Sequence, residues 1–256
     1  YCNDNQLTSL NIQNGNNSNI TAFNATNNPA LTCIQVSDEA FMNTNFGAIF
    51  NKDAIASYST CCSGIVNIPD ANFKAALVAN DLIDTNFDDE IQCGEASAYT
   101  STIDVGNQNI TDLTGIEAFI NIVGLNFYDN NVTSVDISAN SQLNFLGCSN
   151  NQLSVLDVSN NPILNSIICE NNNLTTLDVT SNPFLSTLNV RNNNITTLDL
   201  TNNLNMVNLE CYDNQISTLN LSNMSLLESL GCGLNQLTNL DISANPQLTY
   251  LECNDN

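Results

Sequence analysis

The chain has 256 residues, of which 42% are hydrophobic, so its many Asn and Ser residues do not indicate disorder. Three basic residues stand against 26 acidic ones, and the resulting formal charge of −23 excludes nucleic acid and anionic membranes as partners. The lack of histidine excludes Ser-His-Asp catalysis and His-ligated zinc. The sequence contains no run of 18 apolar residues, so no membrane span is predicted.

Residues 1–36 are expected to be the terminal repeats of a stacked array. The segment Asn11–Ser18 is rich in Asn and Gly and is predicted to be an inserted loop. The segment Phe23–Leu31 matches Leu156–Leu164, which is the second half of a repeat unit described below. Ile34 and Val36 then indicate a last strand, after which the period stops. Because Tyr1 falls within a motif, any targeting signal is expected to precede this segment.

Residues 37–64 are predicted to be the closing cap of that array, since a stack of repeats needs a cover for its exposed end. The segment Ser37-Asp-Glu is a start signal for a short helix. Three apolar residues lie on this predicted helix, namely Phe41, Met42 and Phe46.

Residues 65–102 are predicted to form a helical opening cap for a second array. Ile68-Pro69-Asp70 is a helix start signal. The following residues Phe73, Ala76 and Leu77 share one face of the expected helix, which indicates that this face is buried.

The acidic loop after this helix is the best candidate for metal binding. Hard oxygen donors recur at the spacing of an EF-hand-type calcium loop, in which a bidentate Glu supplies the twelfth position. Asp89 stands where such a loop has Gly, so we expect a strained bend or a weak affinity. The alternative is an acidic surface loop with chance spacing. The predicted ligands of a structural calcium ion are Asp84, Asn86, Asp88, Glu90 through its carbonyl, Gln92 and Glu95.

Residues 103–256 are predicted to form one β-rich solenoid, because the sequence repeats every 21 residues from Leu125 onward. Leu146-x-Cys148 is echoed by Leu156-x-Val158, so each coil is expected to have two short extended segments and two turns. Asn side chains at the bends can satisfy main-chain groups of neighbouring coils. The apolar column is Leu125, Leu146, Ile167, Leu188, Leu209, Leu230 and Leu251. The asparagine column is Asn130, Asn151, Asn172, Asn193, Asn214, Asn235 and Asn256.

These residues resemble the leucine-rich-repeat family, whose pattern is L-x-x-L-x-L-x-x-N/C-x-L, and in particular its short bacterial variety with a nested half-repeat. The resemblance covers about 150 residues of this chain. It implies leucine-rich-repeat coils with short parallel strands and small helical caps. It implies little about function, because the family is defined by its scaffold.

The cysteines divide into two groups. Six occupy one inward column, where a free thiol behaves as a small hydrophobe: Cys2, Cys148, Cys169, Cys211, Cys232 and Cys253. The disulfide candidates lie outside that column, in or near the caps: Cys33, Cys61, Cys62 and Cys93. We expect Cys33 to pair with Cys61 or Cys62 and the remaining cysteine to pair with Cys93, although four cysteines allow three pairings. Such bonds predict an oxidising compartment.

A column of aspartates points outward from the second half of each coil. It consists of Asp136, Asp157, Asp178, Asp199 and Asp241, and only Asn220 interrupts it. Stacked carboxylates repel one another unless cations or water screen them. The column is interpreted as a solvated stripe that favours solubility, with a strip of bound cations as the alternative.

The outward positions of the other strand face carry aromatic residues and the only arginine of the chain. This composition is typical of a surface that binds a ligand. The alternative is ordinary variation at exposed positions of a solenoid. The predicted ligand-facing patch is Tyr128, Phe145, Glu170, Arg191, Glu210, Tyr212 and Tyr250.

Together these features predict a non-enzymatic, extracellular module of a bacterial surface protein with a structural or adhesive role. Cys2–Asn5 is repeated as Cys253–Asn256, so the expected partners are copies of itself or adjoining cassettes, end to end. The chain is then a window on a tandem arrangement, or a subunit whose open ends meet others in a fibre. The rival hypothesis is a recognition module that binds a protein or glycan through the patch, and a two-carboxylate glycan hydrolase is a weaker one.

Overall fold

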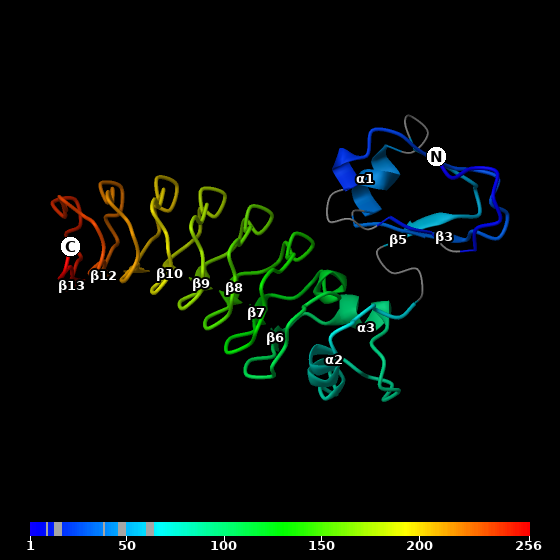
Figure 1. The fold of residues 1–256 in the computed structure, drawn as a ribbon, viewed down its shortest axis with the longest axis horizontal. Helices are drawn as coiled ribbons and strands as arrows, with labels where there is room; N and C mark the ends of the chain where they lie inside the picture. Colours follow the sequence, from blue (N-terminus) through cyan, green and yellow to red (C-terminus); the bar gives the residue numbers. More distant parts are fainter. Residues whose placement is uncertain (9, 13–16, 38, 46–49, 60–63) are drawn as a thin grey trace.

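The computed structural model describes residues 1–8, 10–12, 17–37, 39–45, 50–59 and 64–256, and it contains two coiled units with separate hydrophobic cores (Figure 1). The N-terminal unit extends to residue 59. The larger unit begins at residue 64 and combines a helical cap with the long array. Two of the expected cap cysteines, Cys61 and Cys62, and the expected helix residue Phe46 lie outside the described residues.

The long array is a parallel β-solenoid, as the 21-residue period predicts. Its eight strands form one parallel sheet in sequence order, and from β7 onward paired residues are 21 apart, as in Leu125 with Leu146. The strands are β6 (Thr102–Asp104), β7 (Gly124–Asn126), β8 (Phe145–Gly147), β9 (Ser166–Ile168), β10 (Thr187–Asn189), β11 (Asn208–Glu210), β12 (Ser229–Gly231) and β13 (Tyr250–Glu252). A 3-10 helix, η2 (Ile116–Ala118), lies between β6 and β7.

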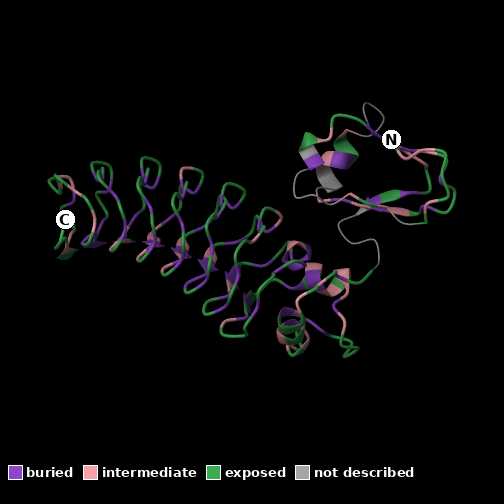
Figure 2. Cartoon of the chain, in the orientation of Figure 1, coloured by how far each residue is buried: buried purple, intermediate pink, exposed green. Residues whose placement is uncertain are grey.

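The core of the array is one continuous cluster of buried apolar side chains. Figure 2 shows buried residues in each coil along the array. Side chains alternate along a short strand, so the middle strand residue and the one two positions later both point inward. Leu146 and Cys148 illustrate this pattern, and both are fully buried. The period thus predicts which residues make the core, and the cysteine column takes its expected packing position.

The first asparagine column connects successive coils through both ends of its amide. Asn172 Nδ2 donates to the carbonyls of Cys148 (2.9 Å) and Cys169 (3.2 Å), while its Oδ1 accepts from the N–H of Leu153 at 3.0 Å. The same bonds recur 21 residues earlier and later, as for Asn151. Buried main-chain groups at each bend are therefore paired, as they must be away from water.

A second asparagine column lies at the other bend and has fewer bonds. Asn182 Nδ2 donates to the carbonyls of Val158 (3.0 Å) and Asn161 (2.9 Å). Its Oδ1 is buried and has no hydrogen-bond partner, as is true of the equivalent oxygens in this column. Met224 occupies the same place in one coil and is also buried. An amide is therefore less necessary at this bend than in the first column.

The aspartate column caps tight turns. Asp157 Oδ1 accepts from the N–H of Ser159 at 2.9 Å, and the other aspartates of the column bond in the same way to the residue two positions on. Asn220, which interrupts the column, makes the equivalent bond to Ser222 at 3.1 Å. A side-chain oxygen, and not a charge, is what this position requires.

The helical cap covers the first coil. Helix α2 (Ala71–Val78) begins after Asp70, whose Oδ1 accepts from the N–H groups of Asn72 (2.9 Å) and Phe73 (3.0 Å). Asp70 Oδ2 accepts from the N–H and the hydroxyl of Thr111, both at 2.8 Å, which joins the helix to the array. Phe73 and Leu77 are buried as predicted, and Ala76 is half-buried. Helix α3 (Cys93–Ala98) follows the acidic loop.

The N-terminal unit differs from the expectation that its period stops near residue 36. Its elements are β1 (Leu10–Asn11), η1 (Asn17–Asn19), β2 (Phe23–Ala25), β3 (Cys33–Gln35), α1 (Glu39–Thr44), β4 (Phe50–Lys52) and β5 (Ser57–Ser59). Strands β1, β3 and β5 form one parallel sheet and β2 pairs with β4. The expected helix is present as α1, but two further strands follow it, so coils continue within residues 37–59.

The half-repeat assigned to residues 23–31 also differs from the expectation. Asn28 Nδ2 donates to the carbonyls of Cys2 and Ala25, both at 3.0 Å, and its Oδ1 accepts from the N–H of Leu7 at 3.1 Å. These are the bonds of the first asparagine column, so the segment corresponds to the first half of a repeat. The misalignment arose because both halves have the same apolar spacing.

Candidate functional site

The open face of the eight-stranded sheet carries the predicted ligand-facing patch. We define the sheet face as the side chains of the first and third residues of each strand and of the second residue after it. All seven residues of the predicted patch occupy such positions. Tyr250 is 50% exposed and Tyr128 is 39% exposed, whereas the other members of the patch are half-buried.

The middle of this face is an ordered group that we call the charged cluster, formed by Glu170, Asn189, Arg191, Glu210 and Tyr212. The Arg191 guanidinium lies over the Tyr212 ring, 5.1 Å from its centroid, which is a cation–π contact. Asn189 Nδ2 donates to Glu170 Oε2 at 2.9 Å. Four of the five members were predicted. Asn189 was missed because an Asn among so many others carries no distinguishing signal.

Glu210 is the member of the charged cluster whose ionisation is most perturbed. Burial raises the pKa of its carboxyl, and the negative charges of Glu252 and Glu170 act in the same direction. The positive charge of Arg191 lowers it, but burial is the larger effect. A hydrogen-bond donor on a bound partner would therefore stabilise this half-buried carboxylate.

Glycines beside the charged cluster allow its side chains to lie flat on the sheet. A Cβ at Gly231 would be 2.1 Å from Glu210 Oε2, and one at Gly233 would be 3.0 Å from the Tyr212 ring. At the other end of the face, a Cβ at Gly106 would be 2.1 Å from the Tyr128 ring. A glycine inside a strand often marks the close approach of another group, and this signal was present in the sequence but not used.

The structure separates the patch into three parts along the array. Tyr128 and Phe145 belong to the coils of β7 and β8, whereas the charged cluster belongs to the coils of β9 to β11. Tyr250 lies beyond it on β13, where its hydroxyl donates to Glu252 Oε2 at 2.9 Å and this bond raises the pKa of the tyrosine. The face is therefore an extended surface with a central cluster and aromatic flanks.

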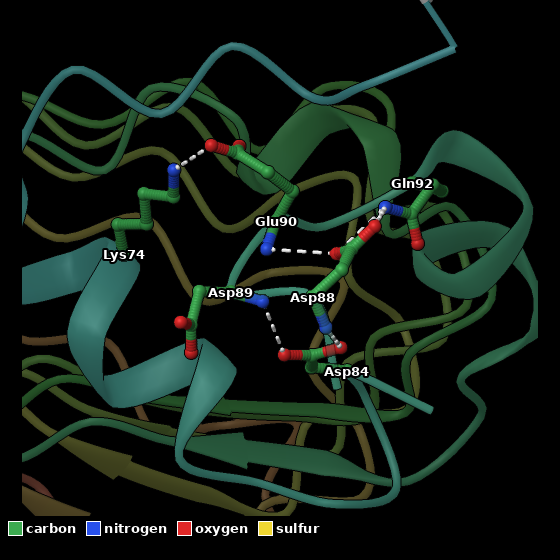
Figure 3. A network of polar contacts seen from close by, with 6 residues as sticks. All are labelled: Lys74, Asp84, Asp88, Asp89, Glu90 and Gln92. Carbon is green, nitrogen blue, oxygen red and sulfur yellow. Dashed lines mark hydrogen bonds and ion pairs between the residues drawn. The ribbon is translucent and has the colours of Figure 1, made fainter. Parts of the chain in front are cut away.

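The predicted calcium loop is tightly folded around its own side chains (Figure 3). Asp84 is buried and accepts from the N–H groups of Phe87 at 2.8 Å and Asp89 at 3.1 Å. Asp89 has a φ of 61°, so the bend adopts the left-handed conformation that favours Gly, as the spacing predicts. Glu90 Oε1 lies 2.6 Å from Lys74 Nζ, so the carboxylate of Glu90 is engaged in an ion pair. The group of Glu90 that the spacing assigns as a ligand is its backbone carbonyl.

The remaining predicted ligands of the loop also contact one another. Gln92 Nε2 donates to both carboxylate oxygens of Asp88 at 3.0 Å, and Asn86 Nδ2 donates to Asp88 Oδ2 at 3.1 Å. Glu95 Oε1 accepts from the N–H of Thr85 at 2.8 Å. All six positions offer the hard oxygen atoms that calcium prefers. Among the described residues, no three His, Cys, Asp or Glu side chains are grouped so that they could hold a metal ion.

The cysteine column consists of free thiols. Burial raises the pKa of the Cys232 thiol to about 11, and burial likewise raises the pKa values of Cys148 and Cys211. Buried protonated thiols are chemically inert, which agrees with a packing role. Cys33 and Cys93 are not among these free cysteines. Because Cys61 and Cys62 lie outside the described residues, the predicted pairing stays a prediction.

Three solved structures that are similar to this chain come from bacteria. The functional domain of InlJ from Listeria monocytogenes, which includes a cysteine ladder, is 35% identical, covers 73% of this chain and 46% of its own, and has a TM-score of 0.59. An LRR protein from Leptospira interrogans is 23% identical, and the match covers 58% of this chain and 41% of that protein with a TM-score of 0.55. Internalin C2 from Listeria monocytogenes is 19% identical, and the match covers 75% of this chain and 100% of that protein with a TM-score of 0.53.

These similarities establish the fold. The long array is a leucine-rich-repeat solenoid of the kind found in those bacterial proteins. The chain spans less than half the length of the InlJ domain and of the Leptospira protein. No protein-family model and no curated protein matches the chain. Within the described part of the chain, the helices are too short or too polar to cross a bilayer.

Proposed function

We propose that this chain is a non-enzymatic recognition and adhesion module of a bacterial surface or secreted protein, and that it binds a protein or glycan through the sheet face. The observation that carries the proposal is the charged cluster, in which Arg191, Tyr212 and Glu210 are held in contact at the centre of the sheet face. Arg and Tyr are the residues most enriched where binding energy concentrates.

The electrostatics of the sheet face favour a partner that donates hydrogen bonds. Glu170 and Glu210 outnumber Arg191 in the charged cluster, and Glu252 adds a third carboxylate close by. The Arg191 charge is already engaged with the Tyr212 ring. A ligand with amino, guanidinium or hydroxyl groups would pair with the carboxylates while stacking on the tyrosines.

An extracellular location is part of the same proposal. Disulfide bonds at the predicted cap cysteines, Cys33 and Cys93 among them, would favour an oxidising compartment. A calcium ion bound by residues 84–95 would tie α2 to α3 and stabilise the cap outside the cell, where calcium is abundant. The similarity to the InlJ domain from Listeria monocytogenes supports the assignment to a bacterial protein.

The test is a binding screen of the whole chain against glycan arrays and purified extracellular-matrix proteins, repeated with an Arg191→Ala/Tyr212→Ala variant. Binding should weaken roughly thirtyfold or more in this variant, because two central contacts each contribute about 1–2 kcal/mol. The matched control is Phe184→Ala, since Phe184 is 56% exposed but lies in the turn before β10, outside the sheet face. Equal binding by all three proteins would show that the sheet face is not the binding surface.

A further inference from the structure

The glutamates of the sheet face follow one another at a regular interval. Glu170, Glu210 and Glu252 belong to the coils of β9, β11 and β13, so successive members are two strands apart. Neighbouring strands of a sheet are about 4.8 Å apart, which gives an interval of about 9.6 Å. We call these three side chains the carboxylate row.

The first two carboxylates of the row are displaced in the same direction, which preserves their interval. Glu170 Oε2 accepts from Asn189 Nδ2 at 2.9 Å, and Asn189 lies on the next strand, β10. A Cβ at Gly231 on β12 would be 2.1 Å from Glu210 Oε2. Each of the two side chains therefore extends over the coil that follows its own.

Among the described residues, no basic group forms an ion pair with the carboxylate row. Lys74 pairs with Glu90 in the cap, and Lys52 belongs to the N-terminal unit. Burial raises the pKa of Glu210 more than the positive charge of Arg191 lowers it. A cationic side chain on a partner would therefore stabilise the row.

The interval of the row distinguishes among the conformations of a bound polypeptide. A polyproline II segment has three residues per turn and rises about 3.1 Å per residue, so every third side chain returns to one side after about 9.3 Å. Over two intervals this repeat falls short of the row by only about 0.6 Å. Two turns of an α-helix span about 10.8 Å, which gives an excess of about 2.4 Å over the same distance. In a β-strand the side chains of one face recur about every 6.7 Å, and neither one nor two such steps match the interval.

The centre of the sheet face favours a polypeptide over a glycan. The Tyr212 ring is half-buried and already contacts the Arg191 guanidinium, so it offers little free surface on which a sugar ring could stack. The contact also shows that this face accommodates a guanidinium beside a carboxylate. The hydroxyl groups of a neutral sugar bring no positive charge to the row, whereas lysine and arginine do.

We propose, on the basis of the proposed function of the sheet face, that its partner is a protein segment in the polyproline II conformation with a lysine or arginine at every third position. The basic side chains pair in turn with Glu170, Glu210 and Glu252. Prolines between them fix the bound conformation in advance, which lowers the entropic cost of binding. The eight strands extend over about 34 Å, so about eleven residues of such a segment fit along the array.

The experiment measures the binding of two synthetic peptides to the full chain by isothermal titration calorimetry. It is done at about 0.15 M salt, where long-range attraction to the acidic chain is largely screened. The probe peptide has about twelve residues and consists of Arg-Pro-Pro triplets. The control peptide has the same composition, with two arginines at each end. The probe should bind about tenfold more tightly or better, because the control can place only one arginine on the row at a time.

Two variants of the row test which carboxylates the probe contacts. Glu210→Gln and Glu170→Gln should each weaken binding of the probe about fivefold, because each removes one charge pair. The matched control is Glu228→Gln, which removes the same charge from an exposed position just before β12, outside the sheet face. This variant should bind the probe like the wild type.

Equal affinity for the two peptides would overturn the proposal, since it would show attraction by charge alone. Equal effects of Glu210→Gln and Glu228→Gln would overturn it as well, and so would a chain that does not bind the probe. A glycan that binds the wild type but not the Arg191→Ala/Tyr212→Ala variant, together with no binding of the probe, would overturn this proposal alone. The proposed function of the sheet face would then stand.

Discussion

The two asparagine columns should respond very differently to the same substitution. Asn172→Ala removes donation to the carbonyls of Cys148 and Cys169, and it leaves the N–H of Leu153 without its only acceptor among the described residues. The two donated bonds at roughly 1 kcal/mol each and the orphaned buried donor at about 1–3 kcal/mol give a loss of about 3–5 kcal/mol in the free energy of unfolding.

Asn182→Ala is the matched comparison, because Asn182 is equally buried at the other bend of the same array. It removes two bonds, but the carbonyls of Val158 and Asn161 keep main-chain donors, and the unsatisfied Oδ1 disappears as well. The net loss should be about 1 kcal/mol. Urea unfolding followed by circular dichroism measures both values. Equal losses would refute the assignment of coil stability to the first column.

Three further predictions concern single carboxylates. Burial raises the pKa of Glu117, and the charge of Asp136 adds to this effect. The folded state disfavours the ionised carboxylate, so the free energy of unfolding should fall as the pH rises through that pKa. In Glu117→Gln, the urea midpoint should depend less on pH between about pH 4 and 8. Millimolar calcium should raise the melting temperature of the wild type but not of Asp88→Asn, and a calcium-insensitive wild type would contradict the proposed site. Asp157→Asn should unfold at the same urea concentration as the wild type, because Asn220 makes the equivalent bond. Asp157→Ala should lower the free energy of unfolding by about 0.5–1 kcal/mol. Equal stability of the two variants would contradict the turn-capping role.

Most of the long array could be predicted because its information is repeated. The 21-residue period identifies the inward residues, and the invariant asparagine column indicates pairing between coils. The roles of single columns were harder to predict. The aspartates were interpreted as a solvated stripe, but their bonds to the second following residue show that they cap turns. Such a bond is local and looks like ordinary surface polarity in a sequence.

The N-terminal unit was predicted less well because its spacing is irregular. Partners in β1 and β3 are 24 residues apart, as for Leu10 and Ile34, whereas Phe23 and Phe50 of β2 and β4 are 27 apart. Without a constant period, the two halves of a repeat cannot be distinguished by apolar spacing alone. On the sheet face, the sequence indicated Arg191 and the tyrosines, but the contacts that fix them depend on glycines in neighbouring coils.

The hydrogen bonds of each array coil reach only the coils on either side, and this has a consequence for how such a gene can change. An in-frame duplication of the DNA for one repeat would add a strand and a complete set of bonds without disturbing any existing contact. The buried substitutions Val190 and Met224 show that single columns also tolerate change within one coil. Recombination can therefore alter the length of the array, and with it the reach of the sheet face, while the helical cap stays as it is.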